Sequence, residues 1–497
     1  MRSRSITVIG AGVGGIAAAA HLARQGFHVT VLEKNSRPGG RCDQFTHDGY
    51  RFDTGPTLFI MPLLYRAEFA SLGSRMEEHL DLLRVDPTYH LVFDDGTRLS
   101  LTSDMKRLEQ QLNAVEKGSF DGFLRYMAEG HRHYDIALER LVTRDFRTAS
   151  DFLAPGNLPL LFQIKPLINH YRNMSSYFDD PRLKAAFTFQ DVYMGLSPFE
   201  APATFSMMPY TELAHGVWYP RGGMYSVVEA LVAIAKQAGV EFVLGTSVQQ
   251  INVSGGRVRG VTLGDGSHMD ADAVLANADL PYVYKELLPQ DGRAGQLEHM
   301  KFSCSVISLF WGTKKRYEAL APHTLFLAHD YRENFESIAR DCDLPANPSV
   351  YIHAPARLDA SMAPEGGDTL IAIVPVGHMA DGNSQDWSAI RERARRIALG
   401  RLASLGMADV EENIDFEACY TPLSWHKRYN LMKGATHGLA HNLTQLAYFR
   451  PQNRHPRYRN MYFVGASTHP GTGMPTALVS ARLTSKRMMD EAASWAE

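Results

Sequence analysis

The sequence predicts an α/β fold in which both ends of the chain build one parallel-sheet domain, with an α+β region inserted between them. Three observations lead to this prediction. A strand, a glycine-rich turn, a helix and a second strand follow one another between residues 6 and 33. A strand, a glycine-rich turn and a helix return between residues 460 and 493. Between these ends, a helix-rich stretch and then a strand-rich stretch replace the regular strand–helix alternation.

The N-terminal unit has the pattern of a Rossmann-type dinucleotide-binding turn. The β-branched run Ile6–Ile9 precedes the turn, residues 17–25 read as a helix, and residues 29–32 form a strand that ends at Glu33. In the turn, Gly10 permits the tight bend, Gly12 lets the backbone approach a pyrophosphate, and Gly15 lets helix and strand pack closely. The helix N-terminus offers free N–H groups to phosphates, and Glu33 can accept hydrogen bonds from ribose hydroxyls. An apolar segment behind Arg2 and Arg4 could instead be a secretory leader. A leader would not continue into this pattern of strand, turn, helix and strand.

A second glycine turn, Arg37-Pro38-Gly39-Gly40-Arg41, follows the acid within a few residues. A domain that binds NAD alone would enter its next crossover here. The paired turns resemble the large FAD family that includes amine oxidases, protoporphyrinogen oxidase and carotenoid desaturases. The resemblance implies FAD as the cofactor, with the N-terminus of the C-terminal helix aimed at the flavin. The cofactor contacts expected on this basis are Gly10, Gly12, Gly14, Gly15, Glu33, Lys34, Gly40, Arg41, Gly55, Pro56, Thr57, Val248, Gly465, Gly473, Met474 and Pro475.

The pattern of elements divides the chain into five segments. The FAD-binding domain takes residues 1–103, 216–300 and 456–497, so it is discontinuous. Residues 104–215 are expected to form a helical region that faces substrate and membrane, and residues 301–455 a substrate domain with a β-sheet and helices. Within the first segment, "FTHDGYRFDTGPT" (residues 45–57) alternates polar and apolar residues, as a hairpin does.

Several motifs together resemble the bacterial carotenoid desaturases of the phytoene desaturase type over nearly the whole chain. The most specific are "GVWYPRGGM", "YIHAPARLDASMAPEG" and "THPGTGMPTALVSAR". The resemblance implies FAD-dependent desaturation of an acyclic carotenoid precursor, by hydride transfer to the flavin and proton loss. Phytoene, converted towards neurosporene or lycopene, is the expected substrate, and C30 4,4'-diapophytoene is the alternative. More distant readings are an amine oxidase-like flavoenzyme and the non-enzymatic Rab escort and GDP-dissociation-inhibitor proteins.

Flavin desaturation does not require a strong acid–base constellation, because the cofactor carries the two-electron chemistry. An apolar tunnel is expected instead, from the aromatic and methionine residues between Phe187 and Tyr210. Two residues are candidates for accepting the proton or orienting the substrate cation. His353 lies on a predicted strand, where the alternative is a structural, hydrogen-bonded histidine. Asp151 resembles an acidic site of the family, although Ser150 replaces the arginine expected beside it; the alternative is a helix N-cap.

Composition limits the partners. The net charge of −3 gives no reason to expect nucleic acid. Four scattered cysteines favour a reducing compartment, so we expect a cytoplasmic protein. No metal site is expected, because His131-x-His133 and His437-x3-His441 lack a third ligand. No apolar run approaches the roughly 20 residues of a spanning helix.

A hydrocarbon substrate nevertheless implies contact with a membrane surface. The segments "NLPLLFQIKPLINHYR" (157–172) and "LFIMPLLYR" (58–66) are candidate docking elements, with core helices as the alternative. Pro159 and Pro166 rule out one long helix in the first of them. The chain contains no second dinucleotide turn for NAD(P)H, so oxygen or a membrane quinone is the expected electron acceptor.

Overall fold

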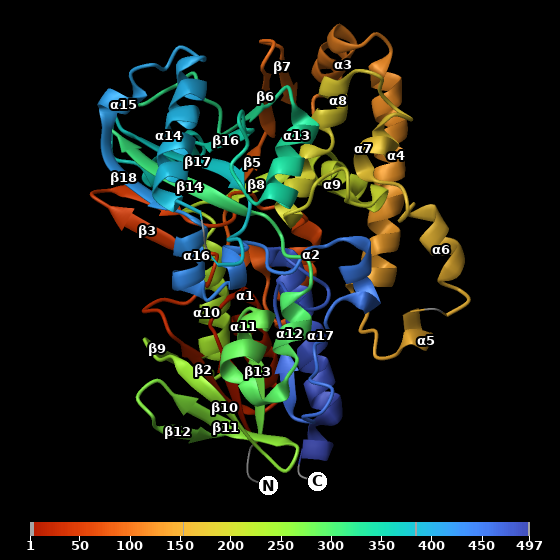
Figure 1. Cartoon of the computed structure of the whole chain (residues 1–497), viewed down its shortest axis with the longest axis vertical. Coiled ribbons are helices and arrows are strands. Elements are labelled where there is room, and N and C mark those ends of the chain that lie inside the picture. The colour runs from red at the N-terminus through yellow and green to blue at the C-terminus, as the bar shows by residue number, and fades with distance from the viewer. Residues whose placement is uncertain (1–3, 153, 383–384, 496–497) are drawn as a thin grey trace.

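The computed structural model describes residues 4–152, 154–382 and 385–495. It places two large sheets at opposite ends of the molecule, and both chain termini lie at the end that holds the parallel sheet (Figure 1). A helix-rich flank, built mainly from residues 105–214, lies along one side of the molecule, mostly beside the seven-stranded sheet (Figure 1). The expected α/β architecture, a parallel-sheet domain with an inserted α+β region, is therefore confirmed.

The parallel sheet has five strands and draws on both ends of the chain. In spatial order they are β19 (Met461–Phe463), β13 (Ala273–Ala276), β1 (Ser5–Ile9), β2 (His28–Glu33) and β9 (Glu241–Leu244). The central strand β1 pairs Ile9 with Leu32 on one side and with Ala276 on the other. Because all pairs are parallel, the carboxyl ends of the strands open at one edge, where doubly wound folds bind their ligands.

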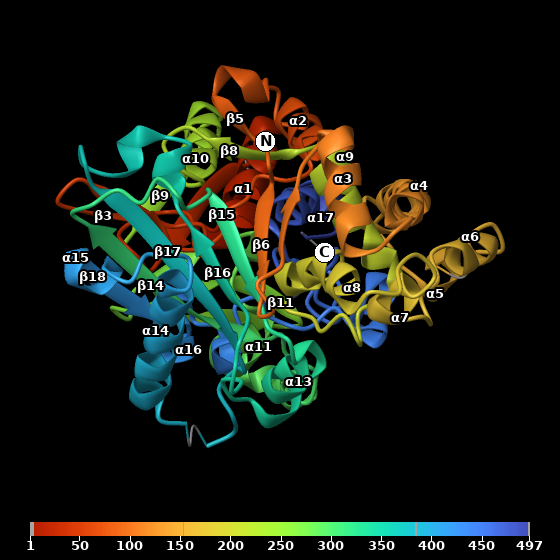
Figure 2. The same cartoon turned by 90° about the horizontal axis from the view of Figure 1, so that it is seen from above.

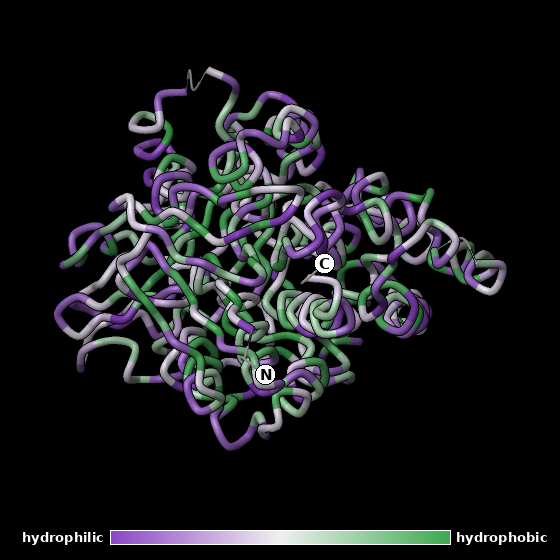
Figure 3. The backbone as a smooth tube through the Cα atoms, turned by 90° about the horizontal axis from the view of Figure 1, so that it is seen from below, coloured by the Kyte–Doolittle hydropathy of each residue, from purple (hydrophilic) through white to green (hydrophobic). Residues whose placement is uncertain are grey.

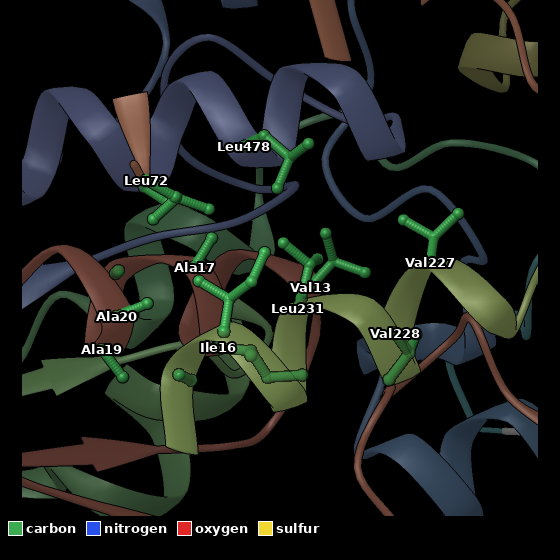
Figure 4. Packing of buried hydrophobic residues seen from close by; sticks show 14 of the residues in the cluster. Val13, Ile16, Ala17, Ala19, Ala20, Leu72, Val227, Val228, Leu231 and Leu478 are labelled. Atoms are coloured by element: carbon green, nitrogen blue, oxygen red, sulfur yellow. The ribbon is translucent and has the colours of Figure 1, made fainter. Parts of the chain in front are cut away.

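Three helices cover one face of this sheet: α1 (Val13–Arg24), α10 (Ser226–Gln237) and α17 (Met474–Glu491). Figure 4 shows how Ile16, Leu231 and Leu478 from these helices pack together. The alanine run of α1 lets the backbones approach closely, and the Ser485 hydroxyl donates to the Ala18 carbonyl at 3.3 Å. Apolar segments run through the interior, whereas the outer loops are mostly hydrophilic (Figure 3). The N- and C-terminal helices therefore form one core.

The opposite face is covered by a three-stranded antiparallel sheet with short helices beside it. Its strands are β10 (Val248–Ser254), β11 (Arg257–Leu263) and β12 (His268–Asp270), and the helices are α11 (Leu280–Tyr282) and α12 (Ala294–Glu298). The turn between β11 and β12 contains Asp265 and Gly266, a pair of residues typical of tight hairpin turns.

The second large sheet has seven strands, which lie side by side in Figure 2. In order they are β18 (Ile414–Tyr420), β14 (Ser305–Thr313), β17 (Asp368–Val376), β16 (Val350–His353), β15 (His323–Leu327), β6 (Tyr89–Phe93) and β7 (Arg98–Leu101). Strands β6 and β7 precede residue 103, yet they extend this sheet, because β6 pairs in parallel with β15. The expected segment 1–103 therefore contributes to both sheets rather than to the FAD-binding domain alone.

The two faces of the seven-stranded sheet differ in their neighbours. The helix α14 (Trp387–Ala403) packs on one face, against Ile307 and Leu309 of β14. The alternate residues Val306 and Ser308 point to the other face, where they line a cavity. One face of the seven-stranded sheet thus packs against α14, and the other face lines the cavity at the edge of the parallel sheet.

The helical flank combines the 19-residue helix α4 with several shorter helices. They are α3 (Met105–Val115), α4 (Ser119–Ala137), α5 (Ala149–Phe152), α6 (Leu158–Gln163), α7 (His170–Met174), α8 (Pro181–Ala186) and α9 (Met207–Ala214), with the 3₁₀ segment η3 (Phe189–Met194). As the two prolines predict, residues 157–172 form no single helix. Within the described residues, no helix combines the length and the apolar character that a membrane crossing needs.

The remaining strands and helices lie between these elements along the chain. They are the hairpin β3 (Gln44–His47) and β4 (Tyr50–Asp53), the pair β5 (Leu82–Val85) and β8 (Val217–Pro220), and the helices α2 (Pro62–Ser71), α13 (Tyr331–Glu336), α15 (Val410–Asn413) and α16 (Pro422–Tyr429). The β3–β4 hairpin is the one that the alternation at residues 45–57 predicts.

Candidate functional site

A cavity of about 510 Å³ lies between the carboxyl edge of the parallel sheet and the inner face of the seven-stranded sheet. Its walls come from both chain ends and from the middle of the chain. The end near the parallel sheet, which we call the cradle, is lined by the two glycine turns, Glu33, the loop after β4 and the start of α17. The other end is lined mainly by apolar side chains.

The first glycine turn presents bare backbone to the cavity. Gly10, Gly12 and Gly14 line it, and α1 begins at Val13 with no side chain capping its free N–H groups. Gly15 does not line the cavity but serves packing: a Cβ atom there would lie 2.3 Å from the Gly10 carbonyl oxygen. The turn therefore leaves the helix N-terminus open to an anionic group.

The second glycine turn packs directly on the first. The Gly39 N–H donates to the Ala11 carbonyl at 2.7 Å, and a Cβ atom on Gly40 would lie 3.2 Å from the Cα of Gly12. Behind them, the side-chain oxygen of Asn277 is buried with no hydrogen-bond partner among the described residues. These glycines leave a groove that side chains would fill.

Glu33 is fixed at the end of β2. Its two carboxylate oxygens accept hydrogen bonds from the Ala11 N–H, the Asn35 N–H and the Asn35 side-chain amide, each at 2.8 Å. A carboxylate has about four lone-pair directions, so acceptor capacity remains on the side that faces the cavity. Such a carboxylate suits a pair of ribose hydroxyls.

Two cations lie along the cradle. The Arg41 guanidinium donates to the Thr436 carbonyl at 2.7 Å; burial lowers its pKa, and the nearby Asp279 carboxylate acts in the opposite direction. Lys34 donates to the Lys427 carbonyl at 3.0 Å and to the Asn430 side chain at 2.6 Å. Arg41 brings positive charge to the same groove as the α1 N-terminus, which suits a diphosphate.

The C-terminal part of the cradle is the turn that precedes α17. Gly465, Gly473, Met474 and Pro475 line it. Gly473 has φ of 115°, a conformation that favours glycine, and it begins α17 without a side-chain cap. A second helix N-terminus therefore faces the cavity.

These features fit FAD. The uncapped N-terminus of α1 and Arg41 would hold its diphosphate, Glu33 would hold its ribose, and the N-terminus of α17 would face the flavin. Val248, together with Thr246 and Ser247, lines the rim beside Glu33, where an adenine would extend from that ribose. The loop Gly55-Pro56-Thr57 also lines the cavity, and its Thr57 hydroxyl lies 2.9 Å from the Tyr351 hydroxyl. Of the expected cofactor contacts, the structure brings all except Gly15 to one cavity wall.

The apolar end of the cavity draws on the predicted aromatic and methionine segment and on the seven-stranded sheet. From the segment come Phe189, Val192, Tyr193, Met194, Phe205, Met207 and Met208, and from the sheet Tyr89, Leu325, Leu327, Tyr351 and Ile373. Phe187, Phe199 and Tyr210, also in the predicted segment, pack in the adjoining core instead. The charged residues that line the cavity in the described part of the chain, Glu33, Lys34, Arg41 and Asp279, all belong to the cradle.

Comparison with known proteins shows the family. The flavin containing amine oxidoreductase family matches residues 13–489. A zeta-carotene-forming phytoene desaturase from Myxococcus xanthus is 42% identical over 98% of this chain and 94% of that protein. A 4,4'-diapophytoene desaturase from Staphylococcus haemolyticus is 33% identical over 98% of this chain and 99% of that protein. The chain belongs to the carotenoid desaturase family.

As a member of this family, the carotenoid desaturase described here is an oxidoreductase with FAD as its cofactor. Its fold is also that of a solved putrescine oxidase, with a TM-score of 0.66, 15% identity and coverage of 98% of this chain and 99% of that one. At that identity the likeness concerns the fold alone.

The two residues considered for proton transfer lie apart from each other. His353 is buried on β16 but is absent from the cavity lining; its ring stacks on His323 at 4.7 Å, and its Nδ1 lies 3.0 Å from the Pro322 carbonyl. Burial lowers its pKa to about 4, so it is neutral at pH 7. The arrangement is that of the structural histidine named as the alternative.

Asp151 is exposed in α5, outside the cavity lining. Its carboxylate accepts from the Arg147 and Thr148 N–H groups at 3.1 and 2.9 Å. It therefore holds the turn before α5, and it is not an N-cap because it lies inside the helix. The structure does not bring Asp151 to the substrate wall.

Residue-by-residue inspection of the sequence misses a set of polar groups in the apolar wall. The hydroxyls of Tyr89 and Tyr193 hydrogen-bond each other, and the Tyr351 hydroxyl lies 2.9 Å from the Thr57 hydroxyl and 2.7 Å from His323 Nδ1. Behind the first pair, the buried Glu212 accepts from the Gln190 amide at 3.1 Å. Only the tertiary fold joins these residues, and nothing in the sequence sets Glu212 apart from Asp191 and Glu200, the other acids of the stretch 187–214.

The histidine pairs with metal-like spacing have other partners. His133 hydrogen-bonds Ser206 and the Gln163 carbonyl, and His441 Nε2 accepts from the Thr472 N–H at 3.0 Å. In the described ranges, no three His, Cys, Asp or Glu side chains gather as metal ligands would.

Proposed function

We propose that this carotenoid desaturase acts on phytoene, removing hydrogen from the acyclic C40 polyene and extending its conjugation towards neurosporene or lycopene. The proposal rests on one observation: a single cavity joins the FAD cradle to a long wall of aromatic, aliphatic and methionine side chains. The charges of the described lining stay at the cradle, so the apolar end suits a hydrocarbon rather than an ammonium substrate. This disfavours an amine oxidase reaction.

Phytoene is preferred to C30 diapophytoene because the identity to the phytoene desaturase is 42%, against 33% to the diapophytoene desaturase. Expression in cells that accumulate either precursor, followed by pigment extraction, distinguishes the two. Coloured polyene from the phytoene host alone supports the proposal. Pigment from the diapophytoene host alone supports the C30 alternative, and pigment from neither host contradicts both.

The protein chain positions the substrate and keeps water out of the site. When bound, FAD supplies the two-electron oxidation. The wall residues hold the polyene extended and exclude water, which raises the effective concentration of the reacting groups. Hydride loss from an allylic carbon leaves a delocalised cation, and the faces of Phe189, Tyr193 and Tyr351 offer it cation–π stabilisation.

We also propose that the protein is cytoplasmic and meets its substrate at a membrane surface. The segment after α5 projects from the body of the molecule (Figures 1 and 2). It exposes Phe162 (81%), Leu167 (85%) and Ile168 (38%), and Phe449, which contacts Phe152 of α5, is 56% exposed. Apolar side chains of this size contribute about 1.5–3 kcal/mol each when buried. The side chains of Leu158 and Leu161, also expected to contribute, lie outside the described residues.

The second expected docking segment, residues 58–66, is less suited. Phe59, Met61, Leu64 and Tyr65 are buried in the core, and Leu63 is the exposed apolar residue on α2. Of the two expected docking segments, the proposed contact therefore uses residues 157–172, together with Phe449.

The electron acceptor is proposed to be oxygen or a membrane quinone. Anaerobic assays in liposomes, with and without added quinone, separate the two. Turnover that requires oxygen supports the first acceptor, and turnover restored by quinone without oxygen supports the second.

A further inference from the structure

A buried carboxyl group without a charged partner lies directly behind the cavity wall. Glu212, on α9, is 1% exposed, and its side-chain Oε2 accepts from the Gln190 amide at 3.1 Å. The other groups that act on it are the neutral phenols of Tyr193 and Tyr89. A carboxyl in such a place costs stability unless it stays neutral, so its presence calls for a functional reason.

A short polar path joins this carboxyl to the substrate space. Tyr89 (β6) and Tyr193 (η3) both line the cavity, and their hydroxyls hydrogen-bond each other. Both lie beside the Glu212 carboxyl, which affects the pKa of each. Tyr351, whose hydroxyl bonds Thr57 of the cofactor loop, lines the same wall and is also affected by Glu212. The path therefore opens close to the loop that would meet the flavin.

We propose that the Glu212 carboxylate takes up, through the hydroxyls of Tyr193 and Tyr89, the proton that the substrate loses as its new double bond forms. The inference rests on the proposed desaturation. A hydride leaves one allylic carbon for the bound FAD, which is the oxidant. The C–H bond on the neighbouring carbon then breaks and its electron pair becomes the second bond of the alkene. The released proton passes to a phenol oxygen while the phenolic proton moves on to Glu212, which ends as a neutral acid.

The surroundings determine when Glu212 is ionised. Burial raises its pKa to about 8, although the hydrogen bonds from Gln190, Tyr193 and Tyr89 act to lower it. The titratable groups around it are phenols and one hydrogen-bonded pair of a carboxyl and a histidine. Tyr89, Tyr193, Tyr351 and Tyr126 (α4) all have pKa values raised by burial, so they stay protonated. Asp191 (η3) is paired with His170 (α7) at 3.0 Å. The step needs the carboxylate, so the rate should rise with pH through about 8.

The test compares wild type with Glu212→Gln, loaded with FAD and assayed on phytoene in liposomes from about pH 6 to pH 10. Glutamine keeps the shape and can still accept from Gln190, but it cannot take a proton. We expect kcat to fall about 100-fold with KM nearly unchanged, and the rise of rate through pH 8 to disappear. Glu68→Gln is the matched control, because Glu68 is also buried and its pKa is also raised by burial, but it lies outside the cavity lining and pairs with Arg482. It should keep the wild-type pH profile.

A second readout does not depend on turnover. The infrared difference spectrum between low and high pH should show a carboxylic acid carbonyl band in wild type that is lost in Glu212→Gln and kept in Glu68→Gln. If Glu212→Gln does not fold, the double variant Tyr89→Phe/Tyr193→Phe breaks the same path, and we expect a similar fall in kcat while the band remains. A wild-type rate and pH profile in a folded variant overturns the inference and leaves the desaturase function standing. Absence of desaturation by wild type overturns both.

Discussion

The hydroxyl groups of Tyr351 and Thr57 lie 2.9 Å apart, and this contact ties the seven-stranded sheet to the loop after β4. Tyr351 also bonds His323 Nδ1 at 2.7 Å, so one phenol links strands β16 and β15 to the Gly55-Pro56-Thr57 loop. Both residues line the cavity, one on the substrate wall and one on the cofactor side. A direct contact therefore joins the seven-stranded sheet to the loop that is expected to meet the cofactor.

Tyr351→Phe should lower stability by about 1–3 kcal/mol, because it leaves the buried Thr57 hydroxyl and His323 Nδ1 without their partner. Thr57→Val removes the other side of the contact. In denaturant unfolding, a double-mutant cycle should give a coupling energy of about 1 kcal/mol. Additive effects of the two substitutions would show that the contact does not join the two halves.

Gly15→Ala should weaken FAD binding at least about 10-fold and destabilise the protein by about 1–3 kcal/mol. The reason is that its Cβ atom would lie 2.3 Å from the Gly10 carbonyl oxygen, so the cofactor turn must move. Gly400→Ala is the matched control: Gly400 lies inside α14 with no atom within 4 Å of the new Cβ. It should stabilise the protein by about 0.5–1 kcal/mol. Equal effects of the two substitutions would contradict the role given to Gly15.

Glu33→Gln should raise the Kd of FAD about 10- to 100-fold, since a charged acceptor for ribose hydroxyls contributes about 1.5–3 kcal/mol. Three N–H donors converge on the carboxylate, so an amide would also turn its own N–H₂ towards one of them. Titration of the apo-protein with FAD, followed by flavin fluorescence, measures the change. Glu229→Gln, on the exposed face of α10, should bind FAD as wild type does. Unchanged affinity in Glu33→Gln would place the ribose elsewhere.

Glu212 should make stability depend on pH. Its pKa rises from 4.5 to about 8 on folding, so the folded protein binds this proton more tightly than the unfolded chain does. The resulting stabilisation is full below about pH 4.5 and is lost as pH rises through about 8. Glu212→Gln lacks this titrating group. Its free energy of unfolding relative to that of wild type should therefore increase by a few kcal/mol as the pH rises from about 4.5 to about 8. A difference that stays constant with pH, measured by denaturant unfolding, would argue against a buried neutral acid.

Phe162→Asp/Leu167→Asp should reduce liposome binding at least about 100-fold, because two exposed apolar side chains would no longer enter the lipid. Met105→Asp is the control: Met105 is 45% exposed on α3, away from the projecting segment (Figure 1). Flotation with liposomes in the absence of detergent measures the binding. Retained flotation of the double variant would move the membrane contact elsewhere.

The cofactor cradle could be predicted from the sequence because its parts are local. The glycine spacing, Glu33 and the Gly473–Pro475 turn each lie within a few residues of an element end, where a turn has few possible conformations. The β3–β4 hairpin and the break at Pro159 and Pro166 follow from equally local rules.

The substrate wall could not be predicted so well, because it depends on long-range pairing. The pairing of β6 with β15 carries Tyr89 beside Tyr193 and Glu212, and nothing near residue 89 indicates it. Residue type and motif alone point to His353 and Asp151. The structure places one behind the wall and the other at the surface.

Anaerobic stopped-flow mixing of the FAD-loaded protein with phytoene in liposomes tests the central claim most directly. The account predicts that the flavin absorbance at about 450 nm bleaches in a single turnover as a more conjugated polyene appears. Flavin that dithionite reduces but phytoene leaves oxidised would contradict it.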